Sequence, residues 1–286
     1  MEIKRIGILH HPRLPESLTL AQSVADRLDA LGAAAWVTSI RDEEAITRAL
    51  SELDLVVTLG GDGTILRAAR LAAPRGVPIL GVNMGQLGFL AELQPGEVFT
   101  KLAAVLAGQY WLEHRLMVQV TSIHNDGHCK LASPLLALND AVVGRGSLSR
   151  TVRVETHIDA DYLTTYIADG VIVATPTGST AYALAAGGPI LQPELQNLLL
   201  APIAPHLTVV HSLVLLPTAV VELKVTTDHP ASLTIDGQND IPLDSGDVVT
   251  ITASPHVSRF LRLQPKAYFY RTLLERLSSR VAHGML

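Results

Sequence analysis

The 286-residue sequence predicts a fold in two parts, with a parallel α/β layer first and a region built mainly of strands after it. Over roughly the first 90 residues, short apolar runs alternate with segments of helical period, which is typical of a parallel sheet covered by helices. From Trp111 to Gln264, short strand-like runs dominate. Asp126-Gly127 and Asp236-Gly237 are hairpin-turn signals within that region, and they support a β-rich second part.

The first elements are expected in the order strand, helix, strand, helix, strand. Strands are predicted at Arg5–His10 and Ala33–Thr38. Between them, apolar residues recur at three- and four-residue spacing up to Gly32, which predicts an amphipathic helix and its C-terminal stop. Asp42 is the expected N-cap of the second helix, and Leu55–Leu59 is the third predicted strand.

The third strand runs directly into a glycine loop, which a helix over Ile65–Ala72 is expected to follow. A fourth apolar run at Val77–Val82 precedes a helical stretch from Glu97 to Leu106, and helical spacing returns at Tyr268–Val281. We therefore predict an α/β domain formed by residues 1–94 and 266–286, and a β-rich domain formed by residues 95–265.

Composition excludes several classes of protein. The apolar fraction is 48%, but no window of about 18 residues is continuously apolar, so no membrane span is expected. The most apolar stretch, Val209–Leu216, is predicted to be a buried strand. A net charge of −5 argues against a nucleic-acid partner. The lone Cys129 and the lack of a secretory signal predict a cytoplasmic protein.

The glycine loop is Gly60, Gly61, Asp62, Gly63 and Thr64. Its glycines allow phosphate to approach backbone N–H groups closely, and the following helix N-terminus favours negative charge. Asp62 would repel that phosphate, so it is expected to accept a hydroxyl proton or help hold a magnesium ion. Arg67 and Arg70 follow at helical spacing, and either could reach a phosphate. The alternative is a tight strand-to-helix turn with an aspartate cap.

Two further segments carry candidate binding groups. Asp169–Leu191 combines a predicted buried strand at Val171–Ala174, a turn, and a helix capped by Ser179 or Thr180. Its amides, hydroxyls and the Tyr182 ring are suited to an adenine edge and a ribose, although ordinary capping explains the same pattern. Asn139 and Asp140 follow the apolar run 135–138, where an amide beside a carboxylate can bracket two vicinal hydroxyls or simply mark a turn.

These motifs resemble those of a known family. Gly60–Thr64 is similar to the GGDGT motif shared by NAD kinases, diacylglycerol kinases and sphingosine kinases, with a related form in phosphofructokinases. Asp169–Leu191 is similar to the long glycine- and threonine-rich signature of NAD kinases, which lipid kinases are not expected to carry. Asn139-Asp140 resembles the family's Asn-Glu/Asp motif in its aspartate form. Weaker similarities lie at Gly81–Leu90, at 202–206 and at 236–238.

The resemblance implies a Rossmann-like N-terminal domain, a β-sandwich-like C-terminal domain and a final helix that packs back on the first domain. It implies phosphorylation of the 2′-hydroxyl of the adenosine ribose of NAD to give NADP, with Asp62 as general base. The implied substrate-binding residues are Asp62, Gly63, Arg67, Asn139, Asp140, Arg150, Asp169, Thr180, Ala181, Tyr182, Ala185, Ala204 and Gln238. The implied phosphate-binding residues are Gly60, Gly61, Gly63 and Thr64.

The expected partners are NAD and a donor, ATP or polyphosphate, that enters with Mg²⁺ or another divalent cation. No metal site within the protein is expected, because His124, His128 and Cys129 lack a fourth ligand. The family resemblance also implies a homodimer or homotetramer. Two alternatives remain at this point: a lipid kinase that shares the glycine loop, and a non-catalytic sensor of NAD or NADP.

Overall fold

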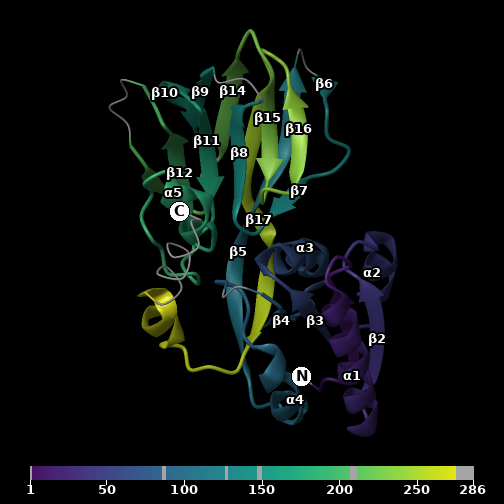
Figure 1. Ribbon diagram of the computed structural model, residues 1–286. Coiled ribbons are helices and arrows are strands. Elements are labelled where there is room, and N and C mark those ends of the chain that lie inside the picture. Colours follow the sequence, from purple (N-terminus) through teal and green to yellow (C-terminus); the bar gives the residue numbers. More distant parts are fainter. Residues whose placement is uncertain (1, 86–87, 126–127, 147–149, 207–210, 275–286) are drawn as a thin grey trace. The chain divides into compact units, whose positions relative to one another are not determined.

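The computed structural model describes residues 2–85, 88–125, 128–146, 150–206 and 211–274 (Figure 1). The chain forms two compact units, of which the first comprises Met1–His114 and Val257–Leu286 and the second comprises Arg115–His256. The predicted combination of an α/β part and a β-rich part is confirmed. No helix among the described residues is long and apolar enough to cross a membrane.

The first unit is built on a parallel sheet with the strand order β2-β1-β3-β4. Its strands are β1 (Arg5–His10), β2 (Ala34–Ser39), β3 (Leu55–Gly60), β4 (Ile79–Asn83) and the C-terminal end of β17 (Val248–Arg262), which pairs with β4 at Phe260 and Ile79. Its helices are α1 (Pro15–Ala30), α2 (Glu43–Ala49), α3 (Asp62–Ala72) and α4 (Val98–Leu106), with 3-10 turns η1 (Ala73–Arg75) and η2 (Pro95–Glu97).

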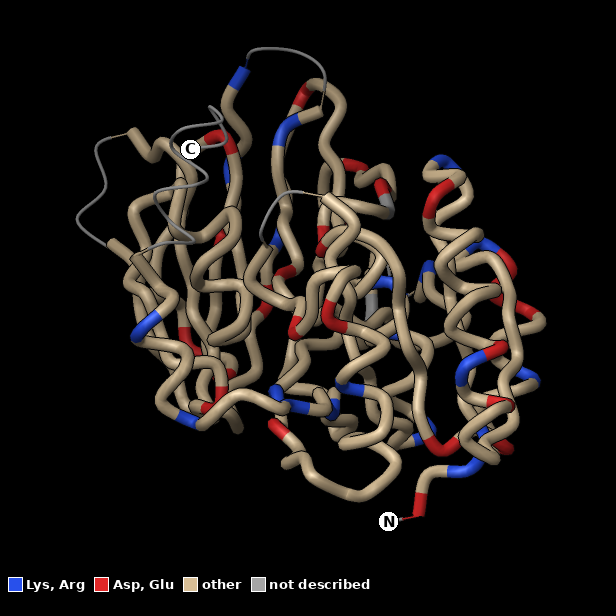
Figure 2. Tube along the Cα trace, turned by 60° about the horizontal axis from the view of Figure 1, so that its bottom comes forward, with Lys and Arg blue, Asp and Glu red and all other residues tan. Residues whose placement is uncertain are grey.

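Helices cover both faces of this parallel sheet. Leu80 and Val82 of β4 belong to a buried cluster that also contains residues of α1 and α4. Gly81 points to the other face because side chains alternate along a strand, and a Cβ there would meet Ile65 of α3. α3 therefore lies on the face opposite α1 and α4. Charges of both signs are interspersed along the helices of this unit (Figure 2), as in the pair Arg48–Glu44 at 3.7 Å.

The observed domain limits differ from the predicted ones. The first unit also contains 95–114 and 257–265, which the sequence analysis assigned to the β-rich part. The reason is packing, because Val98, Leu102 and Val105 of α4 lie in one buried cluster with Val24 and Leu28 of α1. A local pattern of helix followed by strands does not reveal which sheet each element joins.

Several N-terminal predictions are confirmed in detail. β1 has the predicted bounds, and the Asp42 carboxylate caps α2 by accepting the N–H of Ala45 at 3.2 Å. α3 begins earlier than predicted, at Asp62, because Gly61 adopts the extended N-cap conformation. Asp62 therefore lies in the first helical turn, where the helix dipole stabilises a negative charge.

The second unit is a β-sandwich of two antiparallel sheets. One sheet contains β9 (Val152–Ile158), β10 (Asp161–Ala168), β14 (Val221–Thr226) and the first part of β17, with β5 (Trp111–Asn125), β6 (His128–Cys129) and β7 (Leu135–Ala137) attached. The other has the order β13-β12-β11-β8-β15-β16, formed by β13 (Leu213–Leu215), β12 (Leu198–Ile203), β11 (Gly170–Ala174), β8 (Asp140–Arg145), β15 (Ala231–Ile235) and β16 (Asn239–Leu243).

Alternate residues of both sheets fill the core between them. Val143 of β8 and Leu233 of β15 face a buried cluster shared with Val154 of β9 and Val249 of β17. Their neighbours Val142 and Thr234 therefore point away from that core, on the outer face of the second sheet. The short α5 (Tyr182–Ala185) and the turn η3 (Gly178–Thr180) cover part of this outer face through Ala183.

The turns and the edge strand of this unit agree only in part with the sequence predictions. The Asp236-Gly237 turn is confirmed, and both residues have positive φ, at 50° and 64°. The other hairpin signal, Asp126-Gly127, lies outside the described residues. The prediction of a buried strand at Val209–Leu216 is wrong in its described part, because β13 is short and at the sheet edge and Leu216 is 73% exposed.

The final predicted helix is described only in its first turns. Residues 268–274 are helical, and the Tyr270 and Leu274 side chains are 67% and 73% exposed. The rest of the predicted segment, 275–281, lies outside the described residues. The implied packing of this helix on the first domain therefore stays a prediction.

Candidate functional site

The glycine loop links β3 to α3 at the carboxyl end of the parallel sheet. A Cβ at Gly60 would overlap the Thr64 side chain, so the loop can close over its own helix only because residue 60 is glycine. Asp62 is half-buried, while Gly63 is exposed at the helix N-terminus. The buried Thr64 hydroxyl has no hydrogen-bond partner in the part of the chain that is described.

The loop after β4 lies beside the glycine loop because β3 and β4 are parallel neighbours. Gly60 and Asn83 are paired in the sheet, and the N–H of Met84 donates to the carbonyl of Gly60 at 3.1 Å. Two N–H groups of this second loop bind the aspartate: Phe89 donates to Asp62 Oδ2 at 3.0 Å and Leu90 to Oδ1 at 3.3 Å. The Asp62 carboxylate thus has a fixed orientation at the edge where ligands bind in α/β sheets.

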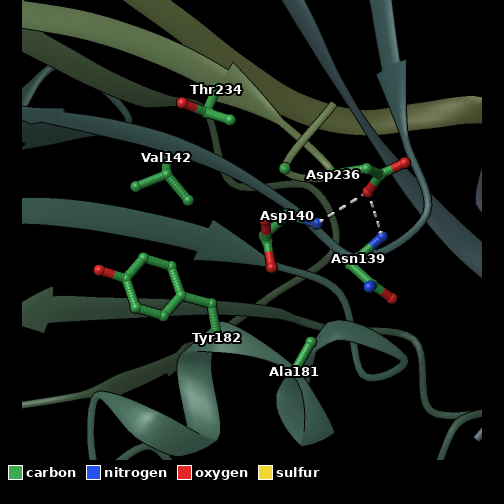
Figure 3. Close-up of a pocket in the computed structure, with 8 residues that line it drawn as sticks. Asn139, Asp140, Val142, Ala181, Tyr182, Thr234 and Asp236 are labelled. Carbon is green, nitrogen blue, oxygen red and sulfur yellow. Dashed lines mark hydrogen bonds between the residues drawn. The ribbon is translucent and has the colours of Figure 1, made fainter. Parts of the chain in front are cut away.

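A groove runs over the outer face of the second sheet in the β-rich unit. Its first lobe has a volume of about 310 Å³ and is shown in Figure 3. The lobe is lined by Asn139, Asp140, Val142, Ala181, Tyr182, Thr234, Asp236 and Gly237. The Tyr182 ring is 47% exposed and offers an aromatic face, so this lobe is suited to a base and a polar sugar.

A second lobe of about 320 Å³ shares Val142, Tyr182 and Thr234 with the first. Its other lining residues are Gly144, Arg145, Gly146, Asp169, Ile203 and Ser232. Arg145 Nε donates to Asp169 Oδ1 at 3.0 Å, so this lobe carries a partly exposed ion pair. The first lobe is mainly apolar with a few carboxylates, and the second is mainly polar. The two lobes adjoin and differ in polarity, which suits a molecule with two dissimilar halves.

The turn after β11 is hydrogen-bonded to the segment that carries Asn139. Thr175 donates its N–H to the carbonyl of Asn139 at 2.8 Å and its hydroxyl to the carbonyl of Leu138 at 2.5 Å. A Cβ at Gly178 would overlap the Asn139 backbone, so only glycine permits this approach. The prediction that Ser179 or Thr180 caps the helix is wrong: α5 begins after Ala181 and has no side-chain cap. Those hydroxyls instead donate to the carbonyls of the preceding turn.

Two carboxyl groups lie in one corner of the first lobe, with different environments. Asp236 accepts the N–H groups of Leu138, Asn139 and Asp140 at 3.1, 2.7 and 3.3 Å. Asp140 is 4% exposed, and its burial, together with the nearby charge of Asp236, raises its pKa to about 7. Asp140 can therefore act as a hydrogen-bond donor as well as an acceptor near neutral pH.

The structure brings together some predicted site residues and leaves others apart. Asn139, Asp140, Ala181 and Tyr182 line the first lobe and Asp169 lines the second, while Thr180 is buried beside them. Neither lobe is lined by the other predicted binding residues of this unit: Arg150, Ala185, Ala204 and Gln238. In the first unit, Arg67 pairs with Glu43 of α2 at 3.4 Å, and it follows Asp62 by more than one helical turn.

Sequence reasoning missed Val142, Arg145, Thr234 and the carboxylate of Asp236 as parts of the groove. The sequence placed Asp236 only in a turn and in the weak family similarity at 236–238, and nothing local indicates that its carboxylate binds amides 96 to 98 positions away. Val142 and Thr234 are paired across β8 and β15, which only the sheet register reveals. The positive φ of 44° at Ala204 is likewise a property of the folded chain.

Comparison with known proteins gives consistent matches. The model of the ATP-NAD kinase N-terminal domain matches residues 16–110, and that of the C-terminal domain matches residues 138–263. An NAD kinase of Chloroflexus aurantiacus is 43% identical over 275 residues, covering 96% of this chain and 99% of the relative. An NAD kinase of Dehalococcoides mccartyi is 42% identical over 270 residues, covering 94% of each.

Solved structures are similar over nearly the whole chain. Yeast NADH kinase complexed with NADH has a TM-score of 0.83 and 25% identity, covering 97% of this chain and 88% of that one. An NAD kinase from Archaeoglobus fulgidus in complex with ATP has a TM-score of 0.79 and 26% identity, covering 96% of this chain and 99% of that one.

Proposed function

This chain belongs to the ATP-NAD kinase family, and on that premise we propose that Asp62 is the general base that activates the 2′-hydroxyl of NAD. The enzyme phosphorylates NAD to NADP. The observation that carries the proposed role is the fixed carboxylate of Asp62, which two backbone N–H groups orient at the N-terminus of α3.

We propose that the groove of the β-rich unit binds the dinucleotide. Asn139 and Asp140 are suited to the ribose hydroxyls and the adenine edge, with the Tyr182 ring against the base. The fixed Asp236 supports this assignment, because it holds the backbone of both polar residues. The polar second lobe, with Arg145 and Asp169, is suited to the other half of the dinucleotide.

The proposed reaction transfers one phosphoryl group. Asp62 takes the proton of the 2′-hydroxyl while that oxygen forms a bond to the terminal phosphorus of the donor. The bond between this phosphorus and its bridging oxygen breaks, and the shortened donor leaves with the electron pair. The backbone N–H groups that begin α3 face the glycine loop and stabilise the negative charge of the transferring group.

The donor is proposed to be ATP or polyphosphate, bound as its magnesium complex. The oxygen groups at the glycine loop, the Asp62 carboxylate and the Thr64 hydroxyl, are of the kind that Mg²⁺ prefers. The cation supplies charge neutralisation on the phosphates. The match to a kinase whose structure was determined in complex with ATP supports ATP.

A homodimer or homotetramer in the cytoplasm is also part of the proposal. The edge strand β13 supports an oligomer, because Val214 is 55% exposed and Leu216, which follows the strand, is 73% exposed. Cys129 is free and exposed, which suits a reducing compartment. Sedimentation of the purified protein measures the oligomeric state directly, and a monomer at working concentrations would contradict the first part.

The test of the acceptor and donor is NADP formation by purified protein with NAD and Mg²⁺, using ATP, polyphosphate or neither. We expect NADP with at least one donor. Diacylglycerol or sphingosine in vesicles serves as the competing acceptor, and the family matches favour NAD over these lipids. Phosphorylation of lipid but not NAD would overturn the acceptor, whereas tight NADP binding without transfer from either donor would establish a sensor.

A further inference from the structure

The loop at 88–90 binds the Asp62 carboxylate through the backbone N–H groups of the loop. The N–H groups of Phe89 and Leu90 donate to the two different oxygens of this carboxylate, at 3.0 and 3.3 Å. The Phe89 and Leu90 side chains are buried, at 6% and 2% exposed, so packing as well as hydrogen bonding holds the loop. A carboxylate held by both oxygens cannot rotate freely about its Cβ–Cγ bond, and its reactive lone pairs keep one direction.

Because Gly88 has no side chain, the Asp62 carboxylate can occupy the space beside it. A Cβ built at Gly88 would overlap Cγ and both carboxylate oxygens of Asp62. Any larger residue must therefore displace either the loop or the carboxylate. Gly85, three residues earlier in the same loop, is different, because a Cβ there meets no heavy atom within 4 Å.

Arg262 binds the same loop at the carbonyl of Leu90. Its NH1 donates to the carbonyl of Leu90 at 3.0 Å and to Glu92 at 3.2 Å, and its Nε donates to Glu113 at 2.7 Å. Burial opposes the charge of this guanidinium, but Glu113 and Glu92 more than compensate and raise its pKa above the usual value. Glu92 in turn accepts the N–H groups of Leu263 and Gln264 at 2.7 and 2.8 Å.

We propose that Gly88 and Arg262 are positioning residues for the reaction: Arg262 fixes the 88–90 loop, and the loop fixes the Asp62 carboxylate. This inference rests on the proposed role of Asp62 and extends it to residues that act on the reaction through the Asp62 carboxylate. The order of contacts is Glu92 and Glu113 to Arg262, Arg262 to the Leu90 carbonyl, and the Leu90 and Phe89 N–H groups to Asp62.

The first test compares Gly88→Ala with Gly85→Ala. We expect Gly88→Ala to lower kcat by about 10- to 100-fold, because a misplacement of about 1 Å has effects of that size. KM for NAD should change by less than about threefold, since the groove is untouched and kcat and KM report separate steps. Gly85→Ala should keep the wild-type kcat. A Gly88→Ala enzyme with kcat and KM equal to wild type would overturn the proposal.

Arg262→Lys gives the second test of the positioning role. It tests this role even if the Gly88→Ala protein does not fold. Lysine keeps the positive charge but cannot hold the Leu90 carbonyl and two carboxylates with the same planar group. We expect a lower kcat with an unchanged KM for NAD in the folded protein. Wild-type kcat in folded Arg262→Lys would show that Arg262 is not a positioning residue.

Asp62→Asn, measured in the same series, separates the two claims. If Asp62→Asn keeps wild-type turnover, the proposed base is wrong, whatever Gly88→Ala does. If Asp62→Asn loses turnover while Gly88→Ala and Arg262→Lys match wild type, the assignment of Asp62 as general base is kept. Only the positioning role of Gly88 and Arg262 is then wrong.

Discussion

At the residue scale, the groove contains a carboxyl group whose protonation is coupled to folding. Asp140 is 4% exposed and lies beside Asp236. Its burial is the main cause, and the charge of Asp236 the second cause, that raise its pKa to about 7. The unfolded-state pKa of an aspartate is about 3.9. Between those pH values the folded protein binds a proton that the unfolded chain does not bind. The free energy of unfolding therefore falls as pH rises from about 4 to 7, and the loss persists above pH 7.

We predict that Asp140→Asn removes this dependence on pH. Asparagine has a similar shape and no titrating proton, so the variant should gain stability relative to wild type as pH rises. Between pH 5 and pH 8 the gain should be on the order of 3 kcal/mol, because about two pH units of that range lie below the raised pKa and one pKa unit corresponds to about 1.4 kcal/mol. Urea unfolding at pH 5 and pH 8 measures it. Parallel changes in wild type and variant would contradict the raised pKa.

At the element scale, the turn after β11 depends on close backbone approach. Gly178 lies against the Asn139 backbone, and the Thr175 hydroxyl ties the same two segments together at Leu138. These contacts place the predicted Asp169–Leu191 segment against the Asn139-Asp140 motif. The two motifs form one site only because the turn contains a glycine at that point.

We predict that Gly178→Ala raises KM for NAD at least severalfold and lowers the free energy of unfolding by about 1–3 kcal/mol, the usual cost of an overpacked site. Steady-state kinetics and urea unfolding check both effects. Gly96→Ala is the matched control, because a Cβ there meets no heavy atom within 4 Å and should leave both unchanged. Equal KM and stability for Gly178→Ala would show that the backbone contact at Asn139 is unimportant.

The buried charges around Arg262 join the loop after β4 to the end of β17. The side chains of Arg262, Glu92 and Glu113 are 6%, 0% and 9% exposed. We predict that Arg262→Leu lowers the free energy of unfolding by about 3–5 kcal/mol, since two buried carboxylates then lack their counter-charge. Adding Glu92→Gln and Glu113→Gln should restore part of this loss. Denaturant unfolding that shows no difference between the single and triple variants would contradict a charge effect.

At the scale of the whole molecule, local patterns predicted elements better than they predicted contacts. Apolar spacing located β1, β3 and α1, and the Asp236-Gly237 signal located a hairpin, because these features depend on neighbouring residues. The assignment of α4 to the first unit and the exposure of β13 depend on which sheet face each element meets. Periodicity does not contain that information.

In the candidate site too, features set by neighbouring residues were predicted and features set by long-range contacts were not. The glycine loop, Asn139-Asp140 and Tyr182 were predicted because their motifs are continuous in sequence. The contacts that orient them join residues 27, 97 and 149 positions apart, in the pairs Asp62–Phe89, Asn139–Asp236 and Glu113–Arg262. Such pairs have no local signal, since only the order of strands in the sheets brings their members together.

The most direct test of the central claim compares wild type with Asp62→Asn at saturating NAD, donor and Mg²⁺, with NAD binding measured by calorimetry on both proteins. The account predicts NADP formation by the wild type and about 10²- to 10⁴-fold slower turnover by the variant, which should bind NAD with unchanged affinity. Turnover by Asp62→Asn equal to that of the wild type would contradict Asp62 as the general base.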